Sequence, residues 1–396
     1  MKIMPTTIPK DYDKYFYNRK KDIKLLNAYI SMLKEDIPNQ LLITGKRGVG
    51  KTFLLKKLLK DQNDEYLTLY LDLSNIYARK KRKLTEETLM KELLIEIKKT
   101  ISKDEKLYNK ILKKGKLILN ELKTKDYNLN SEIEIFDIPL ITIKDNYKKL
   151  SKFVMELPQN IVDSSEKIKG FIIVIDEFQL LEDLESPEAF FWLIRSYSQK
   201  QFNVSYIFTG SVSKTSQIIN MINGQTGAFG GRMVQINIEP FSREDTENYV
   251  LERSNNITFT EEGFNQFYRC TQGIPAYINS LCSILPSDCE CDENTIVENM
   301  KLNIDHMAIM WIYVWGRLNV SEKEIIITLV ENDGSSWTNL ADELEFTKPT
   351  ISKYLDSLTN KGIVEYDYME GKYIISDKML KTWLEIKKEQ NGIYPI

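Results

Sequence analysis

The chain has 396 residues, which is long enough for two or three domains, and its composition is that of an ordinary globular protein. Its 54 basic and 57 acidic residues give a net charge of −3, so the whole chain lacks the basic excess of a nucleic-acid-binding protein. No apolar run approaches the roughly 20 residues of a membrane helix. The amino terminus also lacks the apolar core of a signal peptide. We therefore expect a cytoplasmic protein without a membrane partner.

An aromatic cluster opens the chain and is followed by an amphipathic segment. Tyr12, Tyr15, Phe16 and Tyr17 precede residues 18–34, whose apolar side chains recur at helical spacing. Two interpretations of this region remain open: packing against the protein core, or a lid over the base of a bound nucleotide.

Residues 45–52, GKRGVGKT, match the pattern G-x-x-x-x-G-K-[ST] at every fixed position. Residues 40–44 form a short apolar run typical of a buried strand, and residues 53–60 have helical spacing. A strand, a glycine loop and a helix in this order surround a phosphate with backbone N–H groups. A chance glycine-rich turn would not be expected to have both flanks.

This loop predicts a site for ATP and Mg²⁺. Gly45 and Gly50 allow the tight backbone turn. Lys51 is placed to reach the β- and γ-phosphates, and the hydroxyl of Thr52 to bind the metal. The residues expected to bind the nucleotide here are Gly45, Lys46, Arg47, Gly48, Val49, Gly50, Lys51, Thr52 and Phe53.

Residues 66–71 read as a second strand, and the block from about 77 to 165 as an insertion between two strands of the sheet. The block opens with the basic run RKKRK at residues 79–83 and continues with a helical pattern over 84–125. An alternating stretch within 127–145 predicts a short hairpin. The basic run is a candidate nucleic-acid contact or a solvated helix face, and we favour the latter.

A third strand, residues 171–175 (FIIVI), delivers Asp176 and Glu177 at its carboxyl end. Ligand sites of α/β sheets lie at this edge. Asp176 is expected to bind Mg²⁺ together with Thr52, and Glu177 to act as the general base for the attacking water. An extra strand between the phosphate loop and these acids marks the P-loop ATPases with a catalytic glutamate.

The next strand, residues 204–208, ends in Thr209-Gly210-Ser211. Thr209 or Ser211 is placed to orient the attacking water, or else caps the following helix; both interpretations stay open.

Arg232 stands just before a fifth strand, residues 233–238. It is a candidate arginine finger that reaches the γ-phosphate of a neighbouring subunit and so assists catalysis. The alternative is a salt bridge at the start of the strand.

Residues 242–285 form a helical unit whose turn, Gly273-Ile274-Pro275, is expected to bring Pro275 against the nucleotide.

Four cysteines in so long a chain make no disulfide framework. Cys289 and Cys291 lie in an acidic C-x-C loop, but no second Cys or His pair stands nearby, so free thiols are favoured over a metal site.

The tail from about residue 321 has helical patterns at 321–332, 337–344 and 347–361, followed by two strands at 363–368 and 372–375. Three helices and a β-ribbon in this order predict a winged helix-turn-helix. A helix over residues 307–317 is expected to join it to the preceding unit.

Together these motifs resemble the archaeal-type ATPases, relatives of the AAA+ and STAND nucleotide switches and of archaeal origin-recognition ATPases. The phosphate loop, IDEFQLL at 175–181 and the G-x-P turn carry the resemblance, which covers nearly the whole chain except much of 77–165. The family opens with an aromatic residue and G-R-x-x-E, where this chain has Asn18 for the glycine and Asp22 for the glutamate. This chain has no arginine at Gly273 to Pro275, where AAA+ proteins carry one.

The resemblance implies an α/β P-loop NTPase fold with a five-stranded parallel sheet in the order 5-1-4-3-2. The domains expected are an ATPase core at 1–240, a helical lid at 241–318 and the winged helix at 319–396. It further implies ATP binding, slow hydrolysis, nucleotide control of the carboxyl-terminal module and a possible homo-oligomer.

The winged helix is acidic, which argues against DNA as its main partner. Residues 321–390 contain nine Lys/Arg against fourteen Asp/Glu, a net of −5, whereas phosphate contacts supply most non-specific DNA affinity. The wing carries Asp367 and Glu370 where a DNA-binding protein favours cations. We expect this module to pack on the ATPase or on a protein partner. The side chains available for DNA are Lys348, Thr350, Ser352, Lys353 and Lys361.

Three functions therefore compete. The favoured one is a slow ATP-hydrolysing switch; the second is a DNA-binding regulator with a mainly structural ATP site. The third is a protein-interaction scaffold.

Overall fold

The computed structural model describes residues 9–81, 83–102, 109, 131–135, 138–141, 147–211, 217–254 and 256–395. Five parallel strands form the central sheet, in the order β2-β5-β6-β1-β7. Numbered along the chain, these strands have the order 5-1-4-3-2 from one edge to the other, so the predicted topology is confirmed. Their bounds are Leu41–Thr44 for β1, Tyr66–Asp72 for β2, Gly170–Asp176 for β5, Val204–Thr209 for β6 and Val234–Asn237 for β7.

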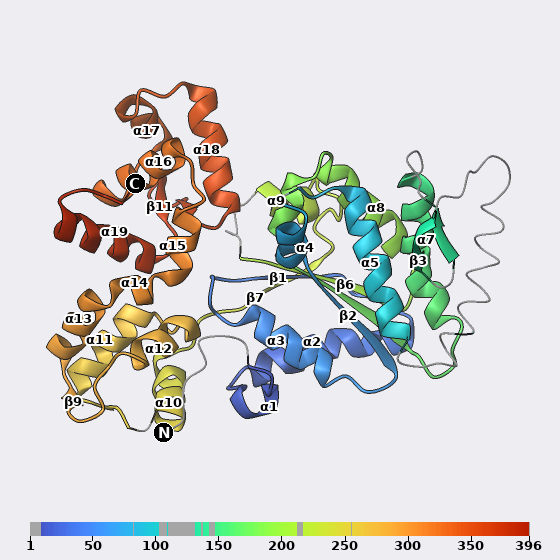
Figure 1. Ribbon diagram of the computed structural model, residues 1–396, viewed down its shortest axis with the longest axis horizontal. Helices are drawn as coiled ribbons and strands as arrows, with labels where there is room; N and C mark the ends of the chain where they lie inside the picture. The colour runs from blue at the N-terminus through green and yellow to red at the C-terminus, as the bar shows by residue number, and fades with distance from the viewer. Residues whose placement is uncertain are drawn as a thin grey trace.

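Two layers of helices enclose the sheet (Figure 1). One layer holds α2 (Lys20–Ser31) and α3 (Lys51–Lys60). The opposite layer holds α4 (Leu73–Arg79), α5 (Glu86–Ile101), α7 (Tyr147–Val162), α8 (Pro187–Ser198) and α9 (Gln217–Asn223).

The side chains of each strand alternate between the two faces of the sheet, which explains why helices pack on both faces. Ile172 and Val174 of β5 join the α2–α3 core cluster, whereas Phe171, Ile173 and Ile175 join the cluster on the other face. Strands buried on both faces are expected to read as continuous apolar runs, as FIIVI does.

The block between β2 and β5 contributes to the second layer. Helices α5 and α7 pack against each other and against β2 and β5. The predicted hairpin is confirmed by the antiparallel pair β3 (Ser131–Ile135) and β4 (Ile138–Ile141). The helical pattern predicted beyond α5, over 103–125, lies outside the described residues apart from residue 109.

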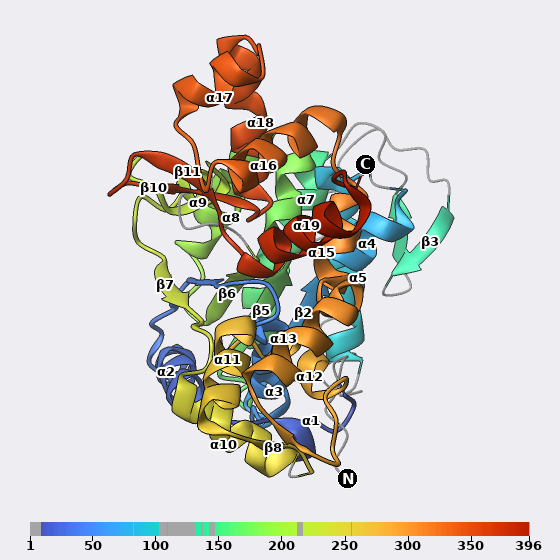
Figure 2. The same cartoon turned by 90° about the vertical axis from the view of Figure 1, so that its left-hand side faces the viewer.

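A helical lid follows the sheet and lies beside the winged helix on one side of the molecule (Figure 2). Two short helices, α14 (Ile304–Met307) and α15 (Ile309–Trp315), join these units where one helix was predicted. The lid helices are α10 (Arg243–Arg253), α11 (Glu261–Thr271), α12 (Pro275–Cys282) and α13 (Glu293–Leu302), with the two-residue strands β8 (Thr258–Phe259) and β9 (Glu290–Cys291).

The predicted winged helix is confirmed. Helices α16 (Val320–Glu331), α17 (Trp337–Glu343) and α18 (Lys348–Asn360) precede the antiparallel wing strands β10 (Val364–Asp367) and β11 (Lys372–Ile375). A last helix, α19 (Lys378–Asn391), packs back toward α14 and α16. Within the described residues, no helix is both long and apolar enough to cross a membrane.

Candidate nucleotide site

The phosphate loop joins β1 to α3 at the carboxyl edge of the sheet. Gly45 and Gly50 have φ values of +147° and +96°, which L-residues with side chains rarely adopt. A Cβ on Gly45 would lie 2.5 Å from the carbonyl oxygen of Ile238. The loop therefore requires glycine at position 45 for space as well as for conformation.

Lys51 is buried at the first turn of α3 and turns back into the loop. Its Nζ donates to the carbonyl oxygens of Gly45 at 2.8 Å and Lys46 at 3.0 Å, and to Ser211 Oγ at 2.8 Å. Burial lowers the pKa of Lys51 to about 8, against the opposing effect of the nearby Glu177 and Asp176. The chain thus holds a desolvated cation where phosphate charge would compensate it.

Asp176 and Thr52 meet although they lie 124 residues apart in the chain, because β5 and β1, the strand that leads into the phosphate loop, end at the same edge of the sheet. Thr52 Oγ1 donates to Asp176 Oδ2 at 2.8 Å, and the hydroxyl of Tyr70 donates to the same oxygen. The backbone N–H of Glu177 donates to Asp176 Oδ1 at 2.9 Å. Burial, followed by the charge of Glu177, raises the pKa of Asp176. A hydroxyl and a carboxylate are oxygen donors of the kind that Mg²⁺ prefers, so these residues fit the predicted ion.

Glu177 follows β5 in the left-handed region, with φ of +59°, and begins the short helix η2 (Phe178–Asp183). Its side chain and Ser211 line the same cavity as Lys51 and Thr52. The side-chain amide of Gln179 donates to the Glu177 carboxylate. Sequence reasoning did not single out Gln179, because a glutamine after an acidic pair has no distinctive pattern.

Thr209 lies opposite Asp176 in the strand register, and its hydroxyl is buried without a hydrogen-bond partner among the described residues. Ser211 lines the cavity and Thr209 does not, and the water-orienting role of either residue stays a prediction. The alternative, a helix cap, depends on residues 212–216, which lie outside the described part of the chain.

A cavity of about 300 Å³ extends from the loop between the amino-terminal segment and the lid. Aromatic rings dominate its far end: the ring centroid of Tyr17 lies 4.9 Å from that of Tyr249 and 5.8 Å from that of Phe241. Pro275 also lines it, and Ala276 N–H donates to the Gly48 carbonyl at 3.3 Å. The lid thus contacts the phosphate loop directly.

The amino-terminal segment is tied to this cavity by Arg19. Its guanidinium donates to the carbonyl oxygens of Val49 at 2.9 Å and Glu239 at 2.7 Å, and lies over the Phe241 ring. Asn18, which stands where the family has glycine, has φ of +55°. Asparagine tolerates this left-handed conformation better than most residues, which explains how the turn survives the replacement.

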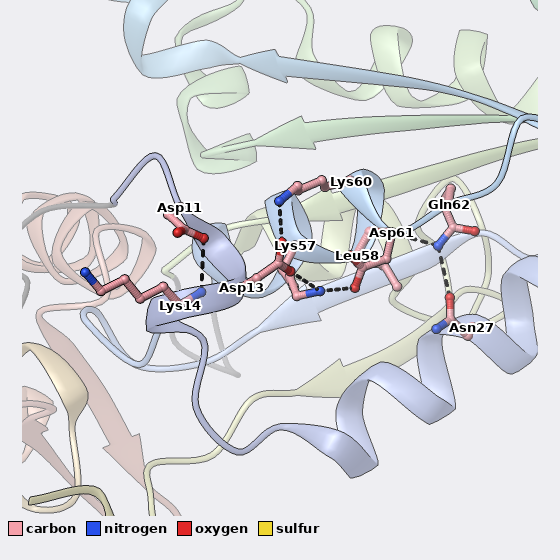
Figure 3. A network of polar contacts seen from close by, with 9 residues as sticks. All are labelled: Asp11, Asp13, Lys14, Asn27, Lys57, Leu58, Lys60, Asp61 and Gln62. Carbon is pink, nitrogen blue, oxygen red and sulfur yellow. Dashed lines mark hydrogen bonds and ion pairs between the residues drawn. The ribbon is translucent and has the colours of Figure 1, made fainter. Parts of the chain in front are cut away.

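The first helix, α1 (Tyr12–Tyr15), lies over α3 and forms surface ion pairs with it. Asp13 lies between Lys57 and Lys60, at 3.0 Å and 2.6 Å (Figure 3). Tyr12 and Phe16 pack on the ring of Phe53. The opening aromatic cluster therefore packs on α3 and borders the cavity, and its role as a lid over a nucleotide base stays a prediction.

Arg232 does not join its own chain's site. It precedes β7, whose Val234 pairs with Leu41 at the start of β1, so it lies at the amino edge of the sheet, opposite the phosphate loop. Its finger role in a neighbouring subunit stays a prediction.

The remaining candidates lie away from the cavity. Cys289 is exposed and Cys291 buried, both as free thiols, and no metal-binding group of three or more His, Cys, Asp or Glu exists in the described part of the chain. In the basic run, Arg79 pairs with Glu92 at 2.9 Å. Arg82 lies outside the described residues.

The winged helix contacts both the lid and the ATPase core. Asn360, at the end of α18, accepts a hydrogen bond from the Gln217 N–H of α9 at 2.8 Å. The buried Asp377 accepts from the Tyr277 hydroxyl at 3.0 Å, and that hydroxyl accepts from Trp311 Nε1 at 2.6 Å. A cavity of about 200 Å³ separates Lys46 and Arg47 from Lys361 and Asp377.

The stability of the folded chain is expected to depend on pH through Glu182 of η2. Burial, followed by the nearby Asp183, raises the pKa of Glu182 to about 7, and Asp356 of α18 adds to the effect. A raised pKa means that the folded chain keeps a proton that the unfolded chain loses, so stability falls as pH rises from about 4.5 to about 7.

Glu182→Gln should therefore raise the melting temperature by roughly 2 °C at pH 8, corresponding to about 1 kcal/mol, and by less at pH 5. Thermal melts at both pH values measure this, with Glu185→Gln on the exposed surface as the matched control. Equal gains at the two pH values would contradict the assignment.

The fold and the site define a P-loop NTPase of the AAA+-like class. Residues 16–281 match the model of an ATPase domain found predominantly in Archaea, and this chain belongs to that family. Residues 318–365 match a winged helix-turn-helix DNA-binding model. No curated protein matches the chain.

Solved structures are similar over nearly the whole chain. The Walker-type ATPase PABY2304 of Pyrococcus abyssi is 17% identical, with a TM-score of 0.64, and the match covers 95% of this chain and 98% of that one. The ORC1 protein of Aeropyrum pernix, solved in complex with DNA, is 11% identical over 97% of this chain and 95% of its own, with a TM-score of 0.48. The first likeness supports the shared fold.

Proposed function

We propose that this protein is an ATP-binding and slowly hydrolysing switch of the archaeal-ATPase and STAND type, which couples its nucleotide state to the winged helix. One observation carries the proposal: Lys51, Thr52 and Glu177 line one end of a cavity with an aromatic far end, and Thr52 donates there to the buried Asp176. The proposed modules are an ATPase core at 1–240, a lid at 241–318 and the winged helix at 319–396; a cytoplasmic location stays a prediction.

Each residue has a distinct proposed role. The loop amides and Lys51 bind the phosphates, and the cavity rings and Pro275 hold the base. Thr52 and Asp176 hold Mg²⁺, which when bound supplies charge neutralisation for the phosphates. Glu177 takes the proton of the attacking water, and Gln179 orients the Glu177 carboxylate.

The coupling proposal rests on the path from loop to winged helix. Arg47 lies over the Trp311 ring at 5.8 Å, and Trp311 donates to Tyr277, which donates to Asp377 at the start of α19. The Asp377 side chain is 4% exposed, and burial raises the pKa of its carboxyl. A shift of the phosphate loop on nucleotide binding would therefore disturb the buried hydrogen bond between Tyr277 and Asp377. A mismatched hydrogen bond is costly in a buried position.

A DNA-binding regulator is the second candidate, favoured by the winged helix-turn-helix match. Against it stand the acidic module and the position of α18, the helix that usually enters the major groove, whose last residue packs on α9. A protein partner therefore remains the preferred target of this module.

Measuring phosphate release from ATP with Mg²⁺, with EDTA, and with added duplex DNA separates these functions. We expect Mg²⁺-dependent turnover that DNA changes by less than about twofold, and weak DNA binding with a shallow salt dependence. Steep loss of DNA affinity with salt would favour the regulator. Absence of Mg²⁺-dependent turnover would contradict the switch.

A further inference from the structure

Tyr70 is the one tyrosine among the described residues that donates to the predicted metal carboxylate, and neither sequence motif contains it. It lies on β2, the edge strand, where its backbone pairs with Val174, two residues before Asp176. Side chains two residues apart share a face of a strand. The phenol therefore extends along the strand toward Asp176, and its hydroxyl donates to Oδ2.

The Asp176 carboxylate has three donors with different roles. Thr52 and Tyr70 donate to Oδ2, and the Glu177 N–H donates to Oδ1. Thr52 is itself a proposed metal ligand: a lone pair of its hydroxyl oxygen would bind the ion while its proton still donates to Asp176. Among the described residues, the side-chain donor to Oδ2 that has no proposed contact with the ion is Tyr70. Asp176 is only 4% exposed, so water cannot easily replace that donor.

The Tyr70 ring also contacts α3, where the Nζ of Lys56 lies 5.0 Å from the ring centroid. Donors to a metal-binding carboxylate set its orientation, and their removal typically lowers metal affinity by about 10-fold to 100-fold.

We propose that Tyr70 is a positioning residue that fixes the Asp176 carboxylate for Mg²⁺ binding. This inference rests on the proposed function, because it concerns the same site. Strand β2 carries neither the phosphate loop nor the acidic pair, so strand order alone gives it no part in the site. The inference gives it one through Tyr70.

The chain provides a matched control on the same strand. Tyr66 lies four residues earlier on the same face of β2, and its hydroxyl is buried without a hydrogen-bond partner in the described part of the chain. Tyr66→Phe and Tyr70→Phe thus remove the same atom from the same strand, and only the second removes a donor to Asp176.

The test uses the full chain and a fluorescent ADP analogue, which cannot be hydrolysed at a γ-phosphate. Its affinity is measured first in EDTA and then during titration with MgCl₂. We expect Tyr70→Phe to raise the Mg²⁺ concentration at half-saturation by about tenfold and to leave the EDTA affinity within about twofold of wild type. Tyr66→Phe should match wild type in both.

Each outcome is decisive. A Tyr70→Phe midpoint equal to that of Tyr66→Phe overturns the inference while leaving the proposed function intact. Loss of binding in EDTA would mean that Tyr70 supports the phosphate loop itself, which also overturns the assignment. If the nucleotide affinity of the wild-type protein does not change with the Mg²⁺ concentration, both the proposed function and the inference are overturned.

Discussion

Lys51→Ala is expected to lower ATP turnover by at least about 100-fold and to weaken nucleotide binding, because it removes the one side-chain cation that the loop holds buried at the phosphate position. The lysine contributes little else. Its three hydrogen bonds go to two loop carbonyls and Ser211, all within the site.

The pKa of Lys51 explains why the effect should be large. Burial has already desolvated the ammonium, at an energetic cost that is visible as the lowered pKa. A phosphate arriving there meets a cation that has little water to shed, in surroundings where charge interactions are stronger than at the surface.

Steady-state phosphate release and titration with a fluorescent nucleotide measure the two effects. Lys60→Ala serves as the control: it lies on the same helix, is exposed and pairs with Asp13, and a surface pair of this kind contributes little to stability. Turnover of Lys51→Ala within tenfold of wild type would remove Lys51 from the catalytic role.

The parts of the candidate site whose relative positions could be predicted from sequence are those fixed by local chemistry or by sheet topology. The phosphate loop is a local motif, since its glycines and the lysine act within eight residues. The contact of Thr52 with Asp176 is long-range, yet it follows from one rule: parallel strands end at a common edge. The apolar runs at residues 171–175 and 204–208 were sufficient to predict β5 and β6 as strands.

What sequence could not predict depends on side chains that meet only after folding. Tyr70 belongs to the stretch YLTLYL, where it looks like any strand aromatic, and only the register of β2 on β5 places it near Asp176. The docking of α18 on α9 depends on how two units pack together, and no local pattern around Asn360 indicates it.

Glu177→Gln is expected to keep ATP binding and to lower turnover by at least about tenfold, because the amide cannot accept the proton of the attacking water. The change is nearly isosteric, so the left-handed backbone at this position and the contact with Gln179 impose no new strain on the variant.

Comparing single-turnover hydrolysis with nucleotide affinity measures both parts of the expectation. Asp183→Asn provides the control, since it removes one exposed negative charge from the same short helix η2 and should leave turnover unchanged. Turnover of Glu177→Gln equal to that of Asp183→Asn would exclude Glu177 as the base.

The affinity for Mg²⁺ should further distinguish the role of Asp176 from the role of Glu177. The charge of Glu177 is one cause of the raised pKa of Asp176, second to burial. Removing that charge makes Asp176 easier to ionise, so Glu177→Gln should bind Mg²⁺ with nucleotide at least as tightly as wild type does. Asp176→Asn should instead lose metal binding and turnover together. Two neighbouring carboxylates, changed in the same way, would then fail at different steps because one faces the ion and the other the water.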